Sequence, residues 1–141
     1  MKVKFLIAEE VRRETEGKVT VLGLFSGDTI LLVRRDQPKY LPEQVQVLEA
    51  IERLAILVTI GDAPAGIHKF KGKMIDPLGG VHHPEMPLGE AQIPKNFFHT
   101  IIVEIKPFIT KIRGVYRFEF YVDEELSTFL FEIRDQNLVA S

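Results

Sequence analysis

The stretch Val115–Asp123, VYRFEFYVD, decides the fold class of this chain. Its side chains alternate in polarity, and one of the two resulting rows is apolar and aromatic: Tyr116, Phe118, Phe120 and Val122. Successive side chains of a β-strand point to opposite faces. The alternation therefore predicts a strand with one face in a core and the other in water.

The alternation continues in the next segment, Thr128–Arg134, where Phe129, Phe131 and Ile133 form the apolar row. Only the connection Glu124–Ser127 separates this segment from the first strand, and so short a connection is typical of an antiparallel hairpin. We expect the two apolar rows to lie side by side as the most secure part of the core.

The same period-two pattern, bounded by turn-forming Gly, Asp and Pro residues, recurs along the chain. It predicts further strands at Val3–Ile7, Lys18–Phe25, Ile67–Ile75 and Phe97–Ile105. Another strand, Thr29–Val33, is predicted after the break at Gly27-Asp28, and the run Ala55–Ile60, rich in β-branched residues, is predicted as a buried strand. Short turns between consecutive strands favour antiparallel pairing. The predicted fold class is mainly β, an antiparallel two-sheet β-sandwich of about seven or eight strands. It would be Greek-key, immunoglobulin-like or C2-like, and a barrel is the alternative.

Three segments depart from this pattern. Pro42 and Glu43 suit the start of a helix, and apolar residues follow at helical spacing, so one short helix is predicted near 42–54. An extended connection is the alternative there. Residues 81–96 contain three prolines and are predicted to be the longest irregular stretch, and residues 136–141 are expected to fray.

The composition is that of an ordinary globular protein, and the length fits one domain spanning residues 1–141. The formal net charge of −2 shows none of the basic excess of nucleic-acid-binding proteins. The absence of cysteine excludes disulfides, thiolate catalysis and thiolate-bound zinc. No apolar run has the length of a signal-peptide core or a membrane span, so we expect a cytoplasmic protein.

Several segments together carry a resemblance to a known family. They are Ala8-Glu9-Glu10, the strand Gly17–Phe25 (GKVTVLGLF), the turn Asp76–Gly80 (DPLGG), the strand Gly114–Asp123 and the Phe129-x-Phe131-x-Ile133 pattern. In these the chain resembles a bacterial family of small β-sandwich proteins catalogued only as a domain of unknown function. The resemblance spans most of the chain and implies the sandwich fold, but it implies no activity and no site residues. Residues 42–54 depart from the family pattern, in which the middle strands follow directly.

A metal site is one candidate for chemistry. His82, His83 and Glu85 follow the turn at Asp76, and imidazole and carboxylate are the usual zinc ligands in a protein without cysteine. Adjacent histidines diverge on a regular strand, but from a loop they can reach one ion. These residues lack the regular spacing of known zinc motifs, so the alternative is a set of polar residues on a proline-rich surface loop.

A row of lysines is the second candidate. Lys69, Lys71 and Lys73 alternate with other residues in the predicted strand Ile67–Ile75, so their charges share one face. Such a row could bind an anionic ligand, a nucleic acid or a lipid, through its phosphates. The alternative is a solvated face on which lysines prevent edge-to-edge aggregation, because no aromatic stacking platform interleaves with them.

Catalysis has little support, since no serine lies in a nucleophile elbow and no glycine-rich phosphate loop is present. We predict no catalytic residue and no cofactor. The leading hypothesis is a non-catalytic interaction module that binds a protein partner or associates with itself as a homo-oligomer. Its support is a set of apolar residues opposite the predicted core rows: Leu22, Leu24, Ile102 and Leu130. Strands apolar on both faces need a cover, such as the predicted helix or a second subunit. A metal-dependent enzyme or binding protein using residues 76–99, and anion binding by the lysine row, are the alternatives.

Overall fold

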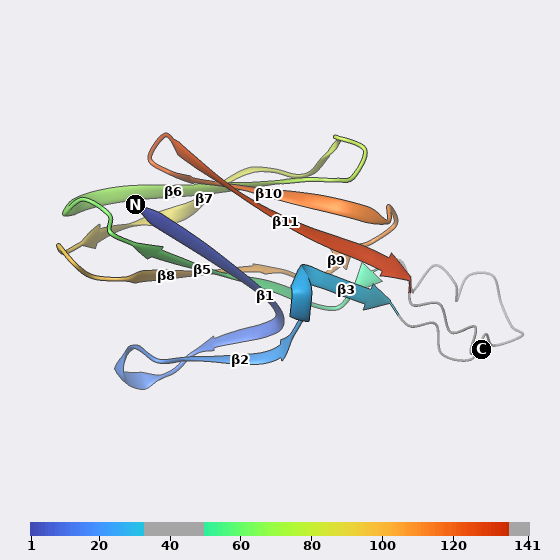
Figure 1. The fold of residues 1–141 in the computed structure, drawn as a ribbon, viewed down its shortest axis with the longest axis horizontal. Coiled ribbons are helices and arrows are strands. Elements are labelled where there is room, and N and C mark those ends of the chain that lie inside the picture. Colours follow the sequence, from blue (N-terminus) through green and yellow to red (C-terminus); the bar gives the residue numbers. More distant parts are fainter. Residues whose placement is uncertain (33–49, 136–141) are drawn as a thin grey trace, which may run out of the picture.

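The protein is mainly β in the computed structural model, which describes residues 1–32 and 50–135 (Figure 1). The described part of the chain holds eleven strands and two short 3-10 helices, Thr15–Gly17 and Ser26–Asp28. No helix in these ranges is long and apolar enough to cross a membrane.

The strands form two large sheets and one small ladder. The four-stranded sheet has the spatial order β2 (Val19–Leu24), β1 (Lys2–Arg13), β5 (Leu54–Gly61) and β8 (His99–Ile105). The five-stranded sheet has the order β3 (Thr29–Leu32), β11 (Glu125–Asp135), β10 (Gly114–Val122), β6 (Gly66–Ile75) and β7 (Val81–Ile93). The ladder pairs β4 (Ala50–Ile51) with β9 (Phe108–Ile109).

The main core lies between the two large sheets, because both contribute side chains to a single buried cluster. Phe5 of β1 stacks on Phe129 of β11 with the ring centroids 5.2 Å apart, and its ring stands edge-on to Phe118 and Phe120. The hairpin prediction is confirmed, since β10 and β11 pair antiparallel along their length. Both predicted apolar rows are buried, with no member more than 7% exposed.

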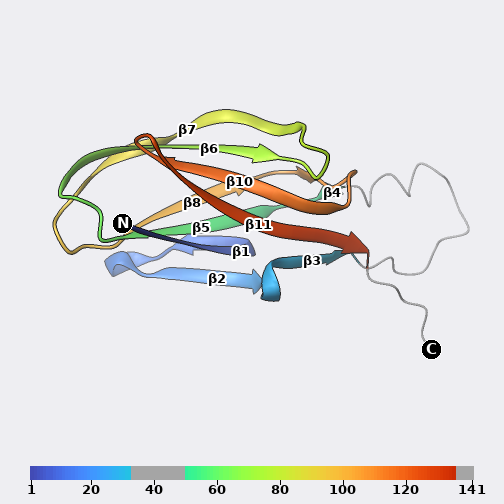
Figure 2. The same cartoon turned by 45° about the horizontal axis from the view of Figure 1, so that its top comes forward.

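A second apolar cluster covers the outer face of the four-stranded sheet. Its buried members come from β1 and β5: Ala8, Val11, Ala55 and Leu57. The first half of β1 pairs with β5, and the second half, from Ala8 onward, pairs with β2. Figure 2 shows β2 below β5 and β8, so the β1–β2 hairpin lies against that outer face. Strands that are apolar on both faces are therefore covered by the chain's own hairpin.

Arg13, at the end of β1, fixes this hairpin across the sheet. Its guanidinium donates to the backbone carbonyl of Thr100 at 2.6 Å and to the Thr100 hydroxyl at 3.2 Å. Thr100 lies on β8, on the other side of β5 from β1. Ile102, one of the residues expected opposite a core row, is half-buried beneath the hairpin, whereas Leu22, Leu24 and Leu130 are exposed.

The helix predicted near 42–54 is wrong over the part that the structure describes. Ala50–Ile51 is strand β4, and Leu54 begins β5. The side chains of Ile51 and Leu54 contact the main core from extended chain, so the apolar spacing does not need a helix. Residues 42–49 and 136–141 lie outside the described ranges.

The irregular stretch predicted over 81–96 is also wrong, because residues 81–93 form β7, which pairs antiparallel with β6. Pro84 and Pro87 are tolerated because β7 is an edge strand with shifts of register along the pairing. The strand count exceeds the predicted seven or eight, and one pair is parallel rather than antiparallel: β3 lies alongside β11. Those two strands are far apart in sequence, so no short turn imposes antiparallel pairing on them.

Candidate functional site

Two of the predicted metal-ligand residues, His82 and His83, come together in the structure. Their Nδ1 atoms are 2.7 Å apart and their ring centroids 4.7 Å apart. Adjacent side chains diverge on a regular strand, but the pairing of β6 with β7 is irregular between Met74 and Ile75. His83 pairs with Met74 and Val81 with Ile75, so His82 is the extra residue of a bulge. The bulge brings its ring to the same side as that of His83.

The neighbours of this histidine pair fix its tautomers. His82 Nε2 donates to the Ile109 carbonyl at 2.8 Å, so neutral His82 accepts at Nδ1 and His83 must donate from its own Nδ1. The His82 ring also stacks on Phe108 with a centroid distance of 4.4 Å. Burial, and then the neighbouring His82, lower the pKa of His83 below its usual value, which favours neutral imidazole in the pair.

The other two predicted ligands do not join the pair. Asp76 is used by the β6–β7 turn, where its Oδ1 accepts hydrogen bonds from the backbone N–H of Leu78 at 2.8 Å and of Gly80 at 3.0 Å. Glu85 forms an ion pair with Lys71 at 3.2 Å. Among residues 1–32 and 50–135, no group of three or more His, Asp or Glu side chains is arranged to hold a metal ion.

The lysine row lies on the outer face of the five-stranded sheet, but β6 is an interior strand rather than an edge. Each lysine has an acidic neighbour. Lys71 pairs with Glu85 and lies over the Tyr121 ring, 5.0 Å from its centroid. Lys69 stands opposite Glu90 of β7, and Lys73 stands opposite Glu119 of β10. The positive charges of the row are therefore balanced by acidic side chains on the same face of the sheet.

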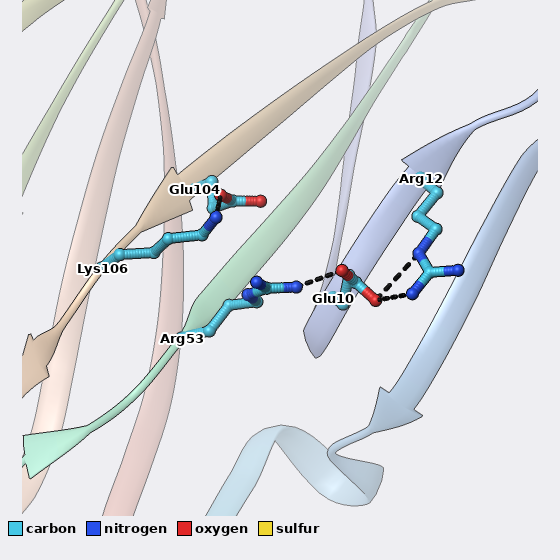
Figure 3. A network of polar contacts seen from close by, with 5 residues as sticks. All are labelled: Glu10, Arg12, Arg53, Glu104 and Lys106. Atoms are coloured by element: carbon cyan, nitrogen blue, oxygen red, sulfur yellow. Dashed lines mark hydrogen bonds and ion pairs between the residues drawn. The ribbon is translucent and has the colours of Figure 1, made fainter.

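A cleft of about 600 Å³ is lined by side chains of β1, β2 and β3, and a charged network that includes Glu10 and Arg53 lies in its wall. Figure 3 shows Glu10 between two guanidinium groups: Arg12 contacts one carboxylate oxygen at 2.8 Å, and Arg53 contacts the other. The hydrogen bond from Arg12 is the main cause that lowers the pKa of Glu10.

The most regular unpaired edge in the described sheets is that of β8. Of the three edge strands of the large sheets whose two ends both lie within the described residues, β7 carries prolines and register shifts, and β2 contains Gly23 at a φ of 67°. In contrast, β8 pairs with β5 in unbroken register along His99–Ile105 and contains no proline or glycine. Prolines, bulges and short length are the usual protection of an edge strand against pairing. The edge of β8 has none of them.

Two aromatic side chains are exposed where β8 begins. Phe97 is 61% exposed and Phe98 is 74% exposed, although both are large apolar rings. The Phe98 ring lies directly over the backbone of Gly61 on β5, where an added Cβ would come within 2.6 Å of it. Glycine at position 61 leaves room for the ring to lie there. The ring thus lies on the outer face of the sheet, in line with the outward-facing residues of β8.

No protein-family model and no curated protein matches this chain. The resemblance to the bacterial sandwich family therefore stays a prediction. The sequence did contain a signal for the β8 edge. Phe97–Ile105 was predicted as a strand apolar on both faces, but its place at the rim of the sheet depends on the order of strands.

An ion pair that the sequence did not predict joins the buried ring of His68 to the exposed carboxylate of Asp123. His68 Nδ1 donates to the Asp123 carboxylate at 2.7 Å, and Nε2 donates to the Pro64 carbonyl at 2.6 Å. Asp123 also accepts from the Lys69 backbone N–H at 3.0 Å. The Pro64 carbonyl and then Asp123 raise the pKa of His68, because only the charged imidazolium can donate to both acceptors at once.

Replacing His68 by glutamine should flatten the dependence of stability on pH. In the folded state the pKa of His68 lies above the usual histidine value of 6.5. The charged form of His68 therefore stabilises the fold fully below the unfolded-state pKa, and this stabilisation is lost as the pH rises through the raised folded-state pKa. We expect the wild type to lose more free energy of unfolding than the variant between about pH 6 and pH 8, measured by urea denaturation. His83 and His99 contribute equally to the pH dependence of both proteins, so their contributions cancel when the two are compared. Equal slopes in the two proteins would contradict the prediction.

Proposed function

We propose that this protein is a non-catalytic assembly module that associates with a second copy of itself. The observation that supports this function is the pairing-competent edge of β8 next to two exposed phenylalanine rings. A regular edge without prolines or bulges offers backbone N–H and C=O groups to another strand, which gives directional hydrogen bonds. Aromatic rings of this size bury roughly 150–250 Å² each when covered, which adds a hydrophobic contribution.

The rest of the surface is less suited to such an interface. The outer face of the four-stranded sheet is covered by the β1–β2 hairpin. The outer face of the five-stranded sheet alternates exposed apolar residues such as Leu130 with charged neighbours such as Arg117, to which it is directly opposed. Interface centres are depleted in charge, so that face fits solvent better than a partner. A cytoplasmic location is consistent with the proposal, because a chain without cysteine needs no oxidising compartment.

Sedimentation velocity and light scattering over a concentration series would test self-association. We expect a reversible dimer with a dissociation constant on the order of micromolar or tighter, as for ordinary specific interfaces. A chain that stays monomeric at high micromolar concentration would reject self-association, and would leave a different protein as the only partner consistent with an interaction module. Binding of an unidentified protein from a lysate would not by itself support the proposal.

Metal binding at His82 and His83 is a second candidate function. The supporting observation is the convergence of the two Nδ1 atoms, with His82 oriented by the Ile109 carbonyl. Ligating histidines commonly donate their other ring nitrogen to a backbone carbonyl in this way. With two protein nitrogens the site would hold zinc or a similar borderline cation, and water would complete the coordination. The His83 proton would move from Nδ1 to Nε2, so that both Nδ1 atoms could bind the ion.

Titration of the tag-free protein with zinc alone tests this candidate. His82→Ala and His83→Ala should each weaken zinc binding by about tenfold or more, the range typical of disrupted metal sites. His99→Ala is the matched control, because His99 is also half-buried but stacks on Phe70, away from the pair. Unchanged zinc affinity in both pair variants would reject the metal site and leave a hydrogen-bonded histidine pair.

A further inference from the structure

We infer that the assembly is a two-fold dimer in which β8 pairs antiparallel with the β8 strand of the partner subunit, centred on Ile102. The inference rests on the proposed self-association and specifies its surface and its register. In this arrangement the four-stranded sheets of the two protomers join into one continuous sheet. Two-fold dimers are the commonest oligomers, and an antiparallel pair of identical strands is compatible with that symmetry.

The faces of β8 restrict the register. Ile101, Val103 and Ile105 point into the main core, whereas Thr100, Ile102 and Glu104 point to the outer face. Residues directly opposite each other in an antiparallel pair share a face, so a continuous sheet pairs outward residues with outward residues. Centring on Ile102 places Ile102 opposite its own copy and Thr100 opposite Glu104 of the partner subunit.

Charge complementarity selects this register. The Arg13 guanidinium is held on the Thr100 carbonyl and hydroxyl, so it lies where Glu104 of the partner subunit would arrive. Two-fold symmetry makes this contact twice. Glu104 already pairs at 2.6 Å with Lys106, which directly follows β8 in its own chain, so an alternating arrangement of charges would result. Opposite charges on facing strands stabilise the pair, and like charges destabilise it.

Neighbouring registers lack this match. Centring on Val103 would bring Lys106 of the partner subunit opposite Thr100 and against Arg13, which places two cations together. Centring on Ile101 would bring Glu104 of the partner subunit opposite Phe98 and leave Arg13 without an acidic partner. With Ile102 at the centre, Phe98 faces Lys106 of the partner subunit, whose aliphatic stem and charge both suit an aromatic ring. The exposed Phe98 ring is then covered.

A charge-exchange experiment tests the register. Arg13→Glu and Glu104→Arg should each raise the dimer dissociation constant by about tenfold or more, because each creates two like-charge contacts. The double variant exchanges the two signs and should restore the wild-type constant to within about threefold. Glu132→Arg is the matched control on the other sheet, and it should leave dimerisation unchanged. Circular dichroism and thermal unfolding verify that each variant is folded.

Cross-linking gives an independent measurement that does not depend on charge. The chain has no cysteine, so Ile102→Cys introduces a unique thiol at the two-fold centre. Mild oxidation with diamide should link the dimer efficiently at this position, and Leu130→Cys, exposed on the other sheet, should not cross-link. A dimer that survives both single charge variants and does not cross-link at residue 102 would overturn the register while the proposed assembly function stands. A monomer in sedimentation would overturn both.

Discussion

Replacing Phe118 by alanine is expected to lower the free energy of unfolding by about 3–5 kcal/mol, the usual range for a fully buried aromatic ring. Phe118 is completely buried on β10, and its ring meets that of Phe5 from the opposite sheet at a centroid distance of 6.2 Å. It also fills the space above Gly72 on β6, where an added Cβ would come within 2.9 Å of the ring. Truncation therefore leaves a cavity where the two sheets meet. Neighbouring side chains cannot fill this cavity unless both sheets shift.

Urea denaturation measures this change, and Val115→Ala is its control. Val115 lies on the same strand but points outward and is half-exposed, so its truncation should change the free energy of unfolding by less than about 0.5–1 kcal/mol. Similar losses in the two variants would show that the row containing Phe118 is not the core between the sheets. The m-value should stay constant, since both variants expose the same surface on unfolding.

Replacing Ala55 by aspartate is expected to destabilise the protein by about 3–5 kcal/mol, because an unpaired charge would be buried beneath the β1–β2 hairpin. Ala55 is completely buried on the outer face of β5, next to Ala8 across the ladder. Its other cross-strand neighbour is Glu104, so a new carboxylate would also face an existing one. Aspartate is too short to carry its charge past the hairpin into water.

Thr59→Asp is the matched control for this second prediction. Thr59 lies on the same face of the same strand but is only partly buried, and it pairs with Lys4 across the ladder. The control should change the free energy of unfolding by less than about 1 kcal/mol. Equal effects would mean that the hairpin does not cover the sheet in solution. Hydrogen exchange of the β2 amides gives a second measurement, since Ala55→Asp should expose them selectively.

These two predictions probe the core between the sheets and the outer face of the four-stranded sheet, and the difference between them is relevant to the proposed assembly. The four-stranded sheet is stabilised on its outer face by its own hairpin, so that face has no need of a partner. The unpaired β8 edge contains no proline, glycine or bulge within the described ranges, and the hairpin contacts its backbone through the Arg13 side chain on the Thr100 carbonyl. Pairing there would extend the sheet without disturbing either apolar cluster.

Part of the site could be predicted from the sequence, and part could not. His82 and His83 were predicted as ligands from a loop, yet they meet because a bulge in β7 rotates His82 to the side of its neighbour. A bulge depends on how two strands pair, so no local sequence pattern predicts it. Asp76 was grouped with them on proximity in sequence, but its carboxylate is occupied by the backbone of its own turn. The ion pair of His68 with Asp123 joins residues 55 positions apart.

The sequence by itself determined the apolar rows of β10 and β11, because alternation with period two is a local property that any buried strand surface must satisfy. It could not determine which strands are interior and which are edges. Prolines at 84 and 87 looked like a loop, and only the edge position of β7 shows why a strand tolerates them. Likewise, Arg13 and Thr100 lie 87 residues apart, and the folded-back hairpin alone brings them together. The order of strands depends on contacts between distant parts of the chain, and that order decides where β8 is open to a partner.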